Sequence, residues 1–209
     1  MKYSYLYLLV FFALSACSPK AEKKAETLDP KLLISCEGVG DVKLKDTYAD
    51  LQKKLGDSVL SEHENNVAGK FTSVWENSPK HLNIYWQESQ APFKTIKYID
   101  VIDGMAPYMT IDSIGVGMSL KDLVKKNGGM AITFKNFSAM SEPGVIKGYN
   151  NGEIPKSNPC LGGVLEWTDQ KPIDVNEMRE FQAQEEIKSF DRILQRYDVV
   201  LSIIRLSPK

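Results

Sequence analysis

The sequence predicts an α+β protein of two tandem modules, each with a short helix packed on an antiparallel meander of strands. Three observations support this fold class. A ten-residue helical motif occurs at 47–56 and again at 119–128. Each copy is followed by apolar segments with strand-like alternation, separated by turn residues, and in each half one such segment ends in tryptophan. The two sheets could also join into one continuous sheet.

Both copies of the motif read [Ser/Thr]-x-x-Asp-Leu-x-Lys-Lys-x-Gly. The hydroxyl residue, Thr47 or Ser119, is suited to cap the first turn of a helix, and the acid three positions later completes the cap. The two lysines suit the negative end of the helix dipole, and the glycine permits the backbone turn that stops the helix. The motif therefore predicts one short helix in each half.

The first module is predicted over 32–104. After its helix, an extended segment is expected to begin at 58–60, and strands are expected at 71–75, 82–86 and 95–102. Apolar residues occur throughout these segments, and turn residues such as Asn, Ser and Pro separate them. A helix followed by strands with short connections is typical of an antiparallel meander covered by the helix on one face.

The second module is predicted over 105–209, with strands within 131–137, 145–149, 163–167 and 199–206. Between the last two segments, apolar residues recur every three or four positions, which predicts an inserted amphipathic helix at about 174–197. This helix is either continuous or broken near Gln182. The apolar stripe of this helix would either cover the sheet or bind a partner protein.

The N-terminus resembles that of bacterial lipoproteins. A lysine precedes an apolar run that is too short to span a bilayer, and the run ends in Leu-Ser-Ala-Cys at 14–17, which is similar to a lipobox. The resemblance implies removal of a signal peptide, 1–16, and acylation of Cys17 with chains such as palmitate. Residues 17–31 would form a flexible polar tether, and Ser18, in place of Asp, favours the outer membrane. A plain signal peptide with a chance cysteine is the alternative.

Two cysteines, Cys36 and Cys160, remain if Cys17 carries lipid. An exported protein folds in an oxidising compartment such as the periplasm, where these two can form a disulfide bond. Two buried thiols are the other interpretation. Neither cysteine has a second ligand at zinc-like spacing, so no metal site is predicted.

The net charge of the chain bears on the class of partner that it can bind. The chain has 209 residues and a net charge of −1, which does not provide the basic surface that nucleic acid requires. The expected partners are the membrane, reached through the lipid anchor, and an unidentified envelope protein; no nucleic acid is expected.

A short helix that opens with [Ser/Thr]-x-x-Asp-Leu, together with a lipobox and a strand meander, is similar to the SmpA/OmlA group of outer-membrane lipoproteins. It is also similar to the beta-lactamase-inhibitor-protein architecture, which pairs two such modules. A Gly-Met-[Ser/Thr] start of the helix is typical of that group, and 117–119 has it, whereas 45–47 reads Lys-Asp-Thr. The resemblance implies a scaffold that binds other proteins.

Candidates for catalysis are few. His63 and His81 could act as general bases, but neither has a serine or cysteine in a recognisable nucleophile motif. No catalytic residue and no cofactor is predicted. We expect a non-enzymatic, lipid-anchored envelope protein with a role in protein–protein interaction or assembly. The alternative is a small-ligand-binding protein or hydrolase with its site between the two modules. Trp75, Trp86 and Tyr85, if exposed on one face, would indicate a ligand or carbohydrate surface.

Overall fold

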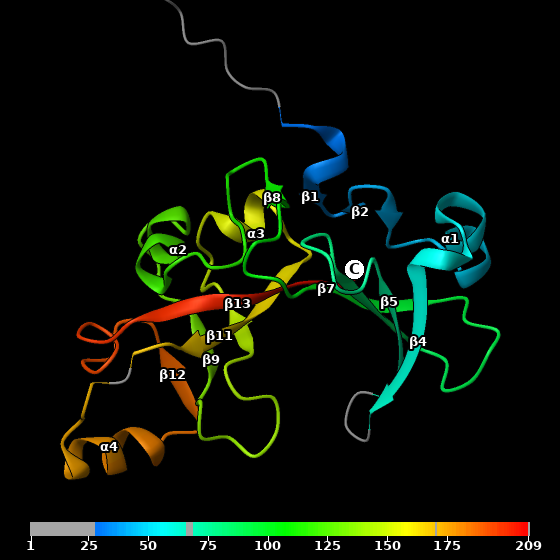
Figure 1. Cartoon of the computed structure of the whole chain (residues 1–209). Coiled ribbons are helices and arrows are strands. Elements are labelled where there is room, and N and C mark those ends of the chain that lie inside the picture. Colours follow the sequence, from blue (N-terminus) through cyan, green and yellow to red (C-terminus); the bar gives the residue numbers. More distant parts are fainter. Residues whose placement is uncertain (1–27, 66–68, 170, 209) are drawn as a thin grey trace, which may run out of the picture.

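The fold is described from a computed structural model over residues 28–65, 69–169 and 171–208. It is an α+β structure (Figure 1). The helices are α1 (Tyr48–Leu55), α2 (Leu120–Lys126), α3 (Ile154–Ser157) and α4 (Val175–Gln182), with 3-10 turns at Pro30–Leu32 and Asp57–Val59. The strands are β1 (Leu33–Ser35), β2 (Gly38–Val39), β3 (Val42–Lys43), β4 (Leu60–Asn65), β5 (Gly69–Val74), β6 (Leu82–Trp86), β7 (Ile96–Val101), β8 (Met109–Thr110), β9 (Thr133–Lys135), β10 (Ile146–Gly148), β11 (Leu161–Trp167), β12 (Glu186–Lys188) and β13 (Val199–Leu206).

The predicted signal peptide, 1–16, and the predicted lipidation site, Cys17, lie outside the described residues. The predicted tether, 17–31, is described from residue 28 onward. There Asp29 accepts a hydrogen bond from the Lys31 backbone N–H and begins the 3-10 turn that leads into β1. Residues 29–31, which the sequence assigns to the tether, thus take part in this turn.

The largest sheet among the described residues has six strands and uses both halves of the chain. Its order is β11-β13-β7-β6-β5-β4, and every pairing in it is antiparallel. The halves meet where β13 pairs with β7, with Ile204 opposite Val101 and Leu206 opposite Ile99. Strands from the two predicted modules therefore lie in one sheet.

Two smaller sheets flank the large one. One has the order β3-β2-β1-β8, in which β1 and β8 run parallel, and the other has the order β10-β9-β12. A single bridge, Val145 to Val164, and the hydrogen bond from Leu165 N–H to the Gly144 carbonyl join the approach to β10 with β11. The β10-β9-β12 sheet therefore extends the large sheet beyond β11.

The hydrophobic core lies between one face of the large sheet and the helices. Alternate side chains of the central strands are fully buried, as the sequence alternation predicts: Val74, Leu82, Ile84, Ile99, Val101, Leu201, Ile204 and Leu206. Helix α1 contributes Leu51, and α2 contributes Leu120 and Leu123. Short helices have little stability alone, so this burial stabilises them in the fold.

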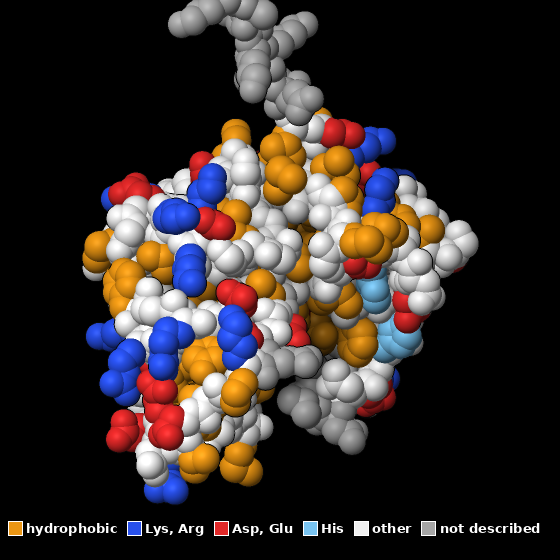
Figure 2. Space-filling view, turned by 60° about the vertical axis from the view of Figure 1, so that its left-hand side comes forward, with side chains coloured by type: hydrophobic (Ala, Val, Ile, Leu, Met, Phe, Trp, Pro, Cys, Tyr) orange, Lys and Arg blue, Asp and Glu red, His pale blue; other side chains and the backbone are white. Residues whose placement is uncertain are grey.

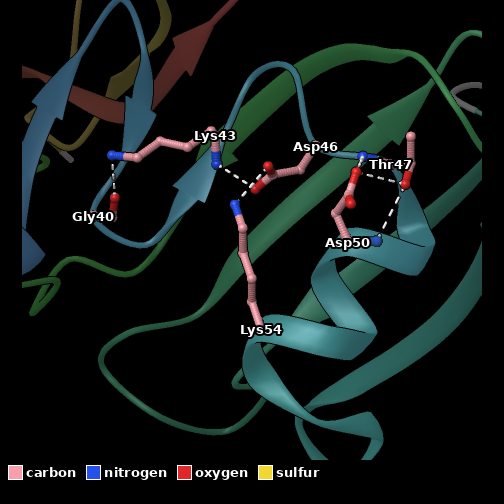
Figure 3. Close-up of polar contacts among 6 residues, drawn as sticks. All are labelled: Gly40, Lys43, Asp46, Thr47, Asp50 and Lys54. Carbon is pink, nitrogen blue, oxygen red and sulfur yellow. Dashed lines mark hydrogen bonds and ion pairs between the residues drawn. The ribbon is translucent and has the colours of Figure 1, made fainter.

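Both predicted helix caps are confirmed. Thr47 Oγ1 accepts from the Asp50 backbone N–H at 3.1 Å, and Asp50 Oδ2 accepts from the Thr47 backbone N–H at 3.0 Å (Figure 3). Ser119 Oγ accepts from the Asp122 backbone N–H in the same way. Helix α1 ends at Gly56, whose φ of 85° lies in the region that glycine adopts without strain.

A buried carboxylate fixes α1 against the β2–β3 hairpin. Asp46 is 4% exposed and accepts hydrogen bonds from the Lys43 backbone N–H at 2.8 Å and from Lys54 Nζ at 2.6 Å (Figure 3). Lys43 Nζ in turn donates to the Gly40 carbonyl. The second lysine of the first motif therefore has a structural partner in addition to its place at the helix end.

The predicted helix at 174–197 is wrong in extent. Asp174 caps it as expected, but the helix ends at Gln182, where the Asn136 side chain donates to the carbonyls of Phe181 and Gln184. The chain then forms β12, in which Ile187 lies opposite Phe134 of β9. The apolar residues after Gln182 are buried by a strand and turns instead of a helix, because the edge of β9 is available for pairing. This pairing is a tertiary contact, and the local periodicity of the sequence does not predict it.

The capping carboxylates predict how stability depends on pH. The backbone and side-chain hydrogen bonds of Thr47 hold the pKa of Asp50 below its usual value. The hydrogen bonds of Lys125 and then Ser119 do the same for Asp122. A carboxylate with a lowered folded-state pKa stabilises the fold above its unfolded pKa of about 4, and this contribution is lost as the pH falls through the folded pKa.

We therefore expect the Asp50→Asn, Asp122→Asn double variant to lose less stability than the natural chain between pH 7 and pH 3. Urea denaturation at the two pH values measures this difference. Glu166→Gln is a suitable control, because Glu166 is an exposed residue of β11, outside both helices. An unchanged pH dependence in the double variant would contradict the capping role.

Candidate functional site

Four ring side chains form a row across the face of the large sheet that lies opposite the core. They come from successive strands: His63 from β4, Phe71 from β5, Tyr85 from β6 and Tyr98 from β7. Each lies directly opposite the next in the strand register, so all four point to the same side. We call these four residues the aromatic row.

The rings of the aromatic row stack on one another. Their centroids are 5.2 Å apart for His63 and Phe71, 5.1 Å for Phe71 and Tyr85, and 4.4 Å for the two tyrosines. The guanidinium of Arg205, on β13, lies 3.9 Å from the Tyr98 centroid and ends the row. All four rings are half-buried. In Figure 2 both histidines lie next to each other on the surface, beside hydrophobic side chains.

Polar side chains run beside the aromatic row on the same face. Ser73 Oγ donates to Asn83 Oδ1 at 2.7 Å, and His81 Nε2 lies 3.0 Å from the same oxygen. Further along, Arg205 donates from Nε and Nη2 to the two carboxylate oxygens of Asp100, at 2.8 and 2.7 Å. Since Asp100 is on β7 and Arg205 on β13, this ion pair spans the junction of the two halves of the sheet.

Burial raises the pKa values of the acidic side chains on this face. It raises the pKa of Tyr85 to about 12, with a further contribution from Asp100, and burial also raises the pKa of Tyr98. Both phenols therefore remain neutral at physiological pH. Burial raises the pKa of Asp100 as well, although the hydrogen bonds from Arg205 oppose this shift.

His63, a predicted candidate base, lies 3.2 Å from a carboxylate oxygen of Glu76. Burial raises the pKa of Glu76, but the hydrogen bonds from Ser61 and His63 outweigh it and keep the pKa below its usual value. The partner that the structure gives the His63 imidazole is thus a carboxylate and not a serine or cysteine, which is not the arrangement of a nucleophile and its base. The His63 and Glu76 side chains are also 36% and 35% exposed, at the surface.

The cysteine prediction is confirmed for the pair that lies within the described residues. Cys36, after β1, and Cys160, before β11, form a disulfide bond with Cα atoms 5.4 Å apart. It connects the end of β1 to the start of β11. The described residues contain no group of three or more His, Cys, Asp or Glu that could hold a metal ion. They also contain no helix long and apolar enough to cross a membrane.

Sequence reasoning located only part of this face. Of the three residues considered in the sequence as an aromatic surface, Tyr85 belongs to the aromatic row and Trp75 packs against the hydrophobic core. Trp86 is buried, with its indole N–H donating to Thr72 Oγ1 at 2.9 Å. Phe71, Tyr98 and the Asp100–Arg205 pair were not predicted. The alternation of apolar residues in β6 and β7 indicates that Tyr85 and Tyr98 lie on the face opposite the core. Only the strand register shows that their rings stack.

Comparison with known proteins gives no further assignment, since no protein-family model, no curated protein and no solved structure matches this chain.

Proposed function

We propose that this chain is a non-enzymatic, lipid-anchored protein of the bacterial cell envelope that binds another envelope protein through the aromatic row. The observation that carries the proposal is the stack of four half-buried rings ending in Arg205, on the sheet face opposite the core. Aromatic residues and arginine dominate the energetics of protein–protein interfaces. Rings held by stacking also lose little conformational freedom on binding.

The interior of the junction favours binding over the hydrolase alternative. A site between the two halves would lie where β7 meets β13, and Asp100 and Arg205 lie opposite each other there. Both carboxylate oxygens of Asp100 accept from Arg205, and the carboxylate side chain is 3% exposed. Arg205 therefore engages the Asp100 carboxylate, which holds the two strands together and is not free for acid–base chemistry.

The strand order supports two tandem modules as part of this proposal. Outward from the β7–β13 pair, one half runs β7-β6-β5-β4, and the other runs β13-β11 and then, across the Val145–Val164 bridge, β10-β9. Each half thus places these strands in reverse sequence order, with β12 added beyond β9 in the second half, and each has a helix capped by a hydroxyl side chain. This arrangement agrees with the proposed resemblance to the SmpA/OmlA group and the beta-lactamase-inhibitor-protein architecture.

The lipid anchor and the location in the cell envelope form the second part of the proposal. Removal of the signal peptide, 1–16, would leave Cys17 as an acylated N-terminus, with Ser18 favouring the outer membrane. The Cys36–Cys160 disulfide supports an oxidising compartment. Several acyl chains give stable anchoring, because each buried CH₂ contributes about 0.8 kcal/mol.

The intact mass of the chain from the membrane fraction tests the anchor. We expect a mature chain that begins at Cys17 and carries acyl mass, and we expect Cys17→Ser to abolish both the added mass and the membrane association. An unprocessed or unacylated chain in the membrane fraction would contradict the anchor and leave the partner-binding role to be judged separately.

The size of the native complex tests the binding role. After mild detergent extraction, the natural chain is expected to migrate as a complex larger than the monomer. Phe71→Ala with Tyr85→Ala is expected to return it to monomer size, whereas Phe190→Ala, which removes an exposed ring from another surface, leaves the complex intact. A complex that withstands the double substitution, or a natural chain that migrates as a monomer, would contradict the role of the aromatic row.

A further inference from the structure

A cavity of ≈ 410 Å³ lies between α4 and the C-terminal ends of β9 and β11. We call it the α4 pocket. Its apolar wall consists mainly of Phe137, Trp167, Phe181 and Met178. The Trp167 ring packs edge-to-face against Phe137 at 5.7 Å and against Phe181 at 5.8 Å, which holds the wall in place. The volume and the aromatic lining are typical of small-molecule sites.

Two polar groups at the α4 pocket have no protein partner. The indole N–H of Trp167 has no acceptor among the described residues, whereas the indole of Trp86, at the end of β6, donates to Thr72. The side-chain amide of Gln182, at the end of α4, likewise bonds to no described residue. The pocket therefore offers a neutral donor and a neutral amide beside an aromatic wall.

The charged groups at the pocket cancel each other. Asp169, whose side chain is 7% exposed, pairs with Lys171 at 2.8 Å, and both line the pocket. An anionic ligand would meet the Asp169 carboxylate, and a cationic ligand would meet the Lys171 ammonium. A neutral ligand avoids both repulsions, and a hydroxyl group can accept from Lys171 and donate to Asp169 at the same time.

We propose that the α4 pocket binds one neutral sugar ring. The ring's apolar C–H face packs against the Trp167 and Phe181 side of the wall, and its hydroxyl groups bond to the Trp167 indole N–H, the Gln182 amide and the Asp169–Lys171 pair. This class of ligand has an apolar face and a rim of groups that both donate and accept, which is the combination that the pocket presents. The proposal does not depend on the partner-binding role, since the aromatic row lies on other strands.

NMR titration of the mature full chain tests the proposal. The probes are the methyl glycosides of glucose, galactose and N-acetylglucosamine, and N-acetylphenylalanine amide serves as the probe for an apolar protein side chain. We expect at least one glycoside to shift the Trp167 indole N–H signal saturably, with a dissociation constant of about 1–10 mM. The indole signal that is missing from the spectrum of Trp167→Phe belongs to Trp167, and the phenylalanine keeps an aromatic ring in the pocket wall.

Gln182→Ala, followed by the Trp167 indole signal, is expected to weaken glycoside binding about fivefold, the loss of one neutral hydrogen bond. Trp167→Phe, followed by the backbone amide signals of Phe181 and Gln182, is expected to weaken it by a similar factor. Val175→Ala, at a 71% exposed position on the same helix, is the matched control and should bind like the natural chain. Gln182 is exposed, so its variant tests the proposal even if Trp167→Phe fails to fold. Saturation by the phenylalanine amide alone, no saturation by any probe, or unchanged binding in Gln182→Ala would overturn the proposal.

Discussion

Removal of the Cys36–Cys160 disulfide is expected to lower the free energy of unfolding by about 4–5 kcal/mol. The two cysteines are 124 residues apart in the sequence, so the bond closes a long loop. In the unfolded chain, this closure removes many conformations, and their return on reduction favours unfolding. Urea denaturation of Cys36→Ser, Cys160→Ser beside the natural chain measures the difference.

Two controls separate the bond from other effects of the substitution. A reducing agent should destabilise the natural chain by a similar amount and leave the double variant unchanged. Single Cys36→Ser should behave like the double variant, because one cysteine cannot form the bond. Equal stability of the oxidised and reduced natural chain would show that the disulfide does not stabilise the fold.

Arg205→Ala is expected to cost about 3–5 kcal/mol of stability, because it leaves the Asp100 carboxylate buried without its partner. The Asp100 and Arg205 side chains are 3% and 22% exposed, and two hydrogen bonds join them. The pair also connects β7 to β13, so its loss weakens the junction between the two halves of the sheet. Urea denaturation at neutral pH measures the effect.

A second variant identifies the cause of that loss. Asp100→Asn combined with Arg205→Met removes both charges and should recover most of the stability that Arg205→Ala loses, since no unpaired charge remains. Lys156→Ala is the matched control, because its ion pair with Glu153 is 63% and 61% exposed and contributes little. If Arg205→Ala costs no more than Lys156→Ala, the pair does not hold the junction.

The elements that local chemistry determines could be predicted from the sequence. The caps at Thr47 and Ser119 form as the motif predicts, because each hydroxyl oxygen accepts from the backbone N–H three residues later. Only at Thr47 does the acid also accept from the backbone N–H of the capping residue. Strands β6 and β13 agree with the predicted segments 82–86 and 199–206, since apolar alternation reflects burial of one face.

Features that depend on contacts between distant segments could not be predicted in the same way. The chain after Gln182 pairs with β9, and no residue within 183–197 carries that information. The pairing of β13 with β7 likewise brings Arg205 to Asp100 and Tyr98, which are more than a hundred positions earlier in the sequence. The aromatic row therefore depends on the strand register, which the sequence alone does not specify.

Photo-crosslinking in cells tests most directly whether the aromatic row binds a partner. Tyr85 is replaced by benzoylphenylalanine in one chain, and Lys53, which is exposed on α1, is replaced in a control chain. We predict that irradiation joins the chain altered at Tyr85 to one second envelope protein, and that the chain altered at Lys53 does not form this adduct. The same adducts from both positions, or none from Tyr85, would contradict a binding surface at the aromatic row.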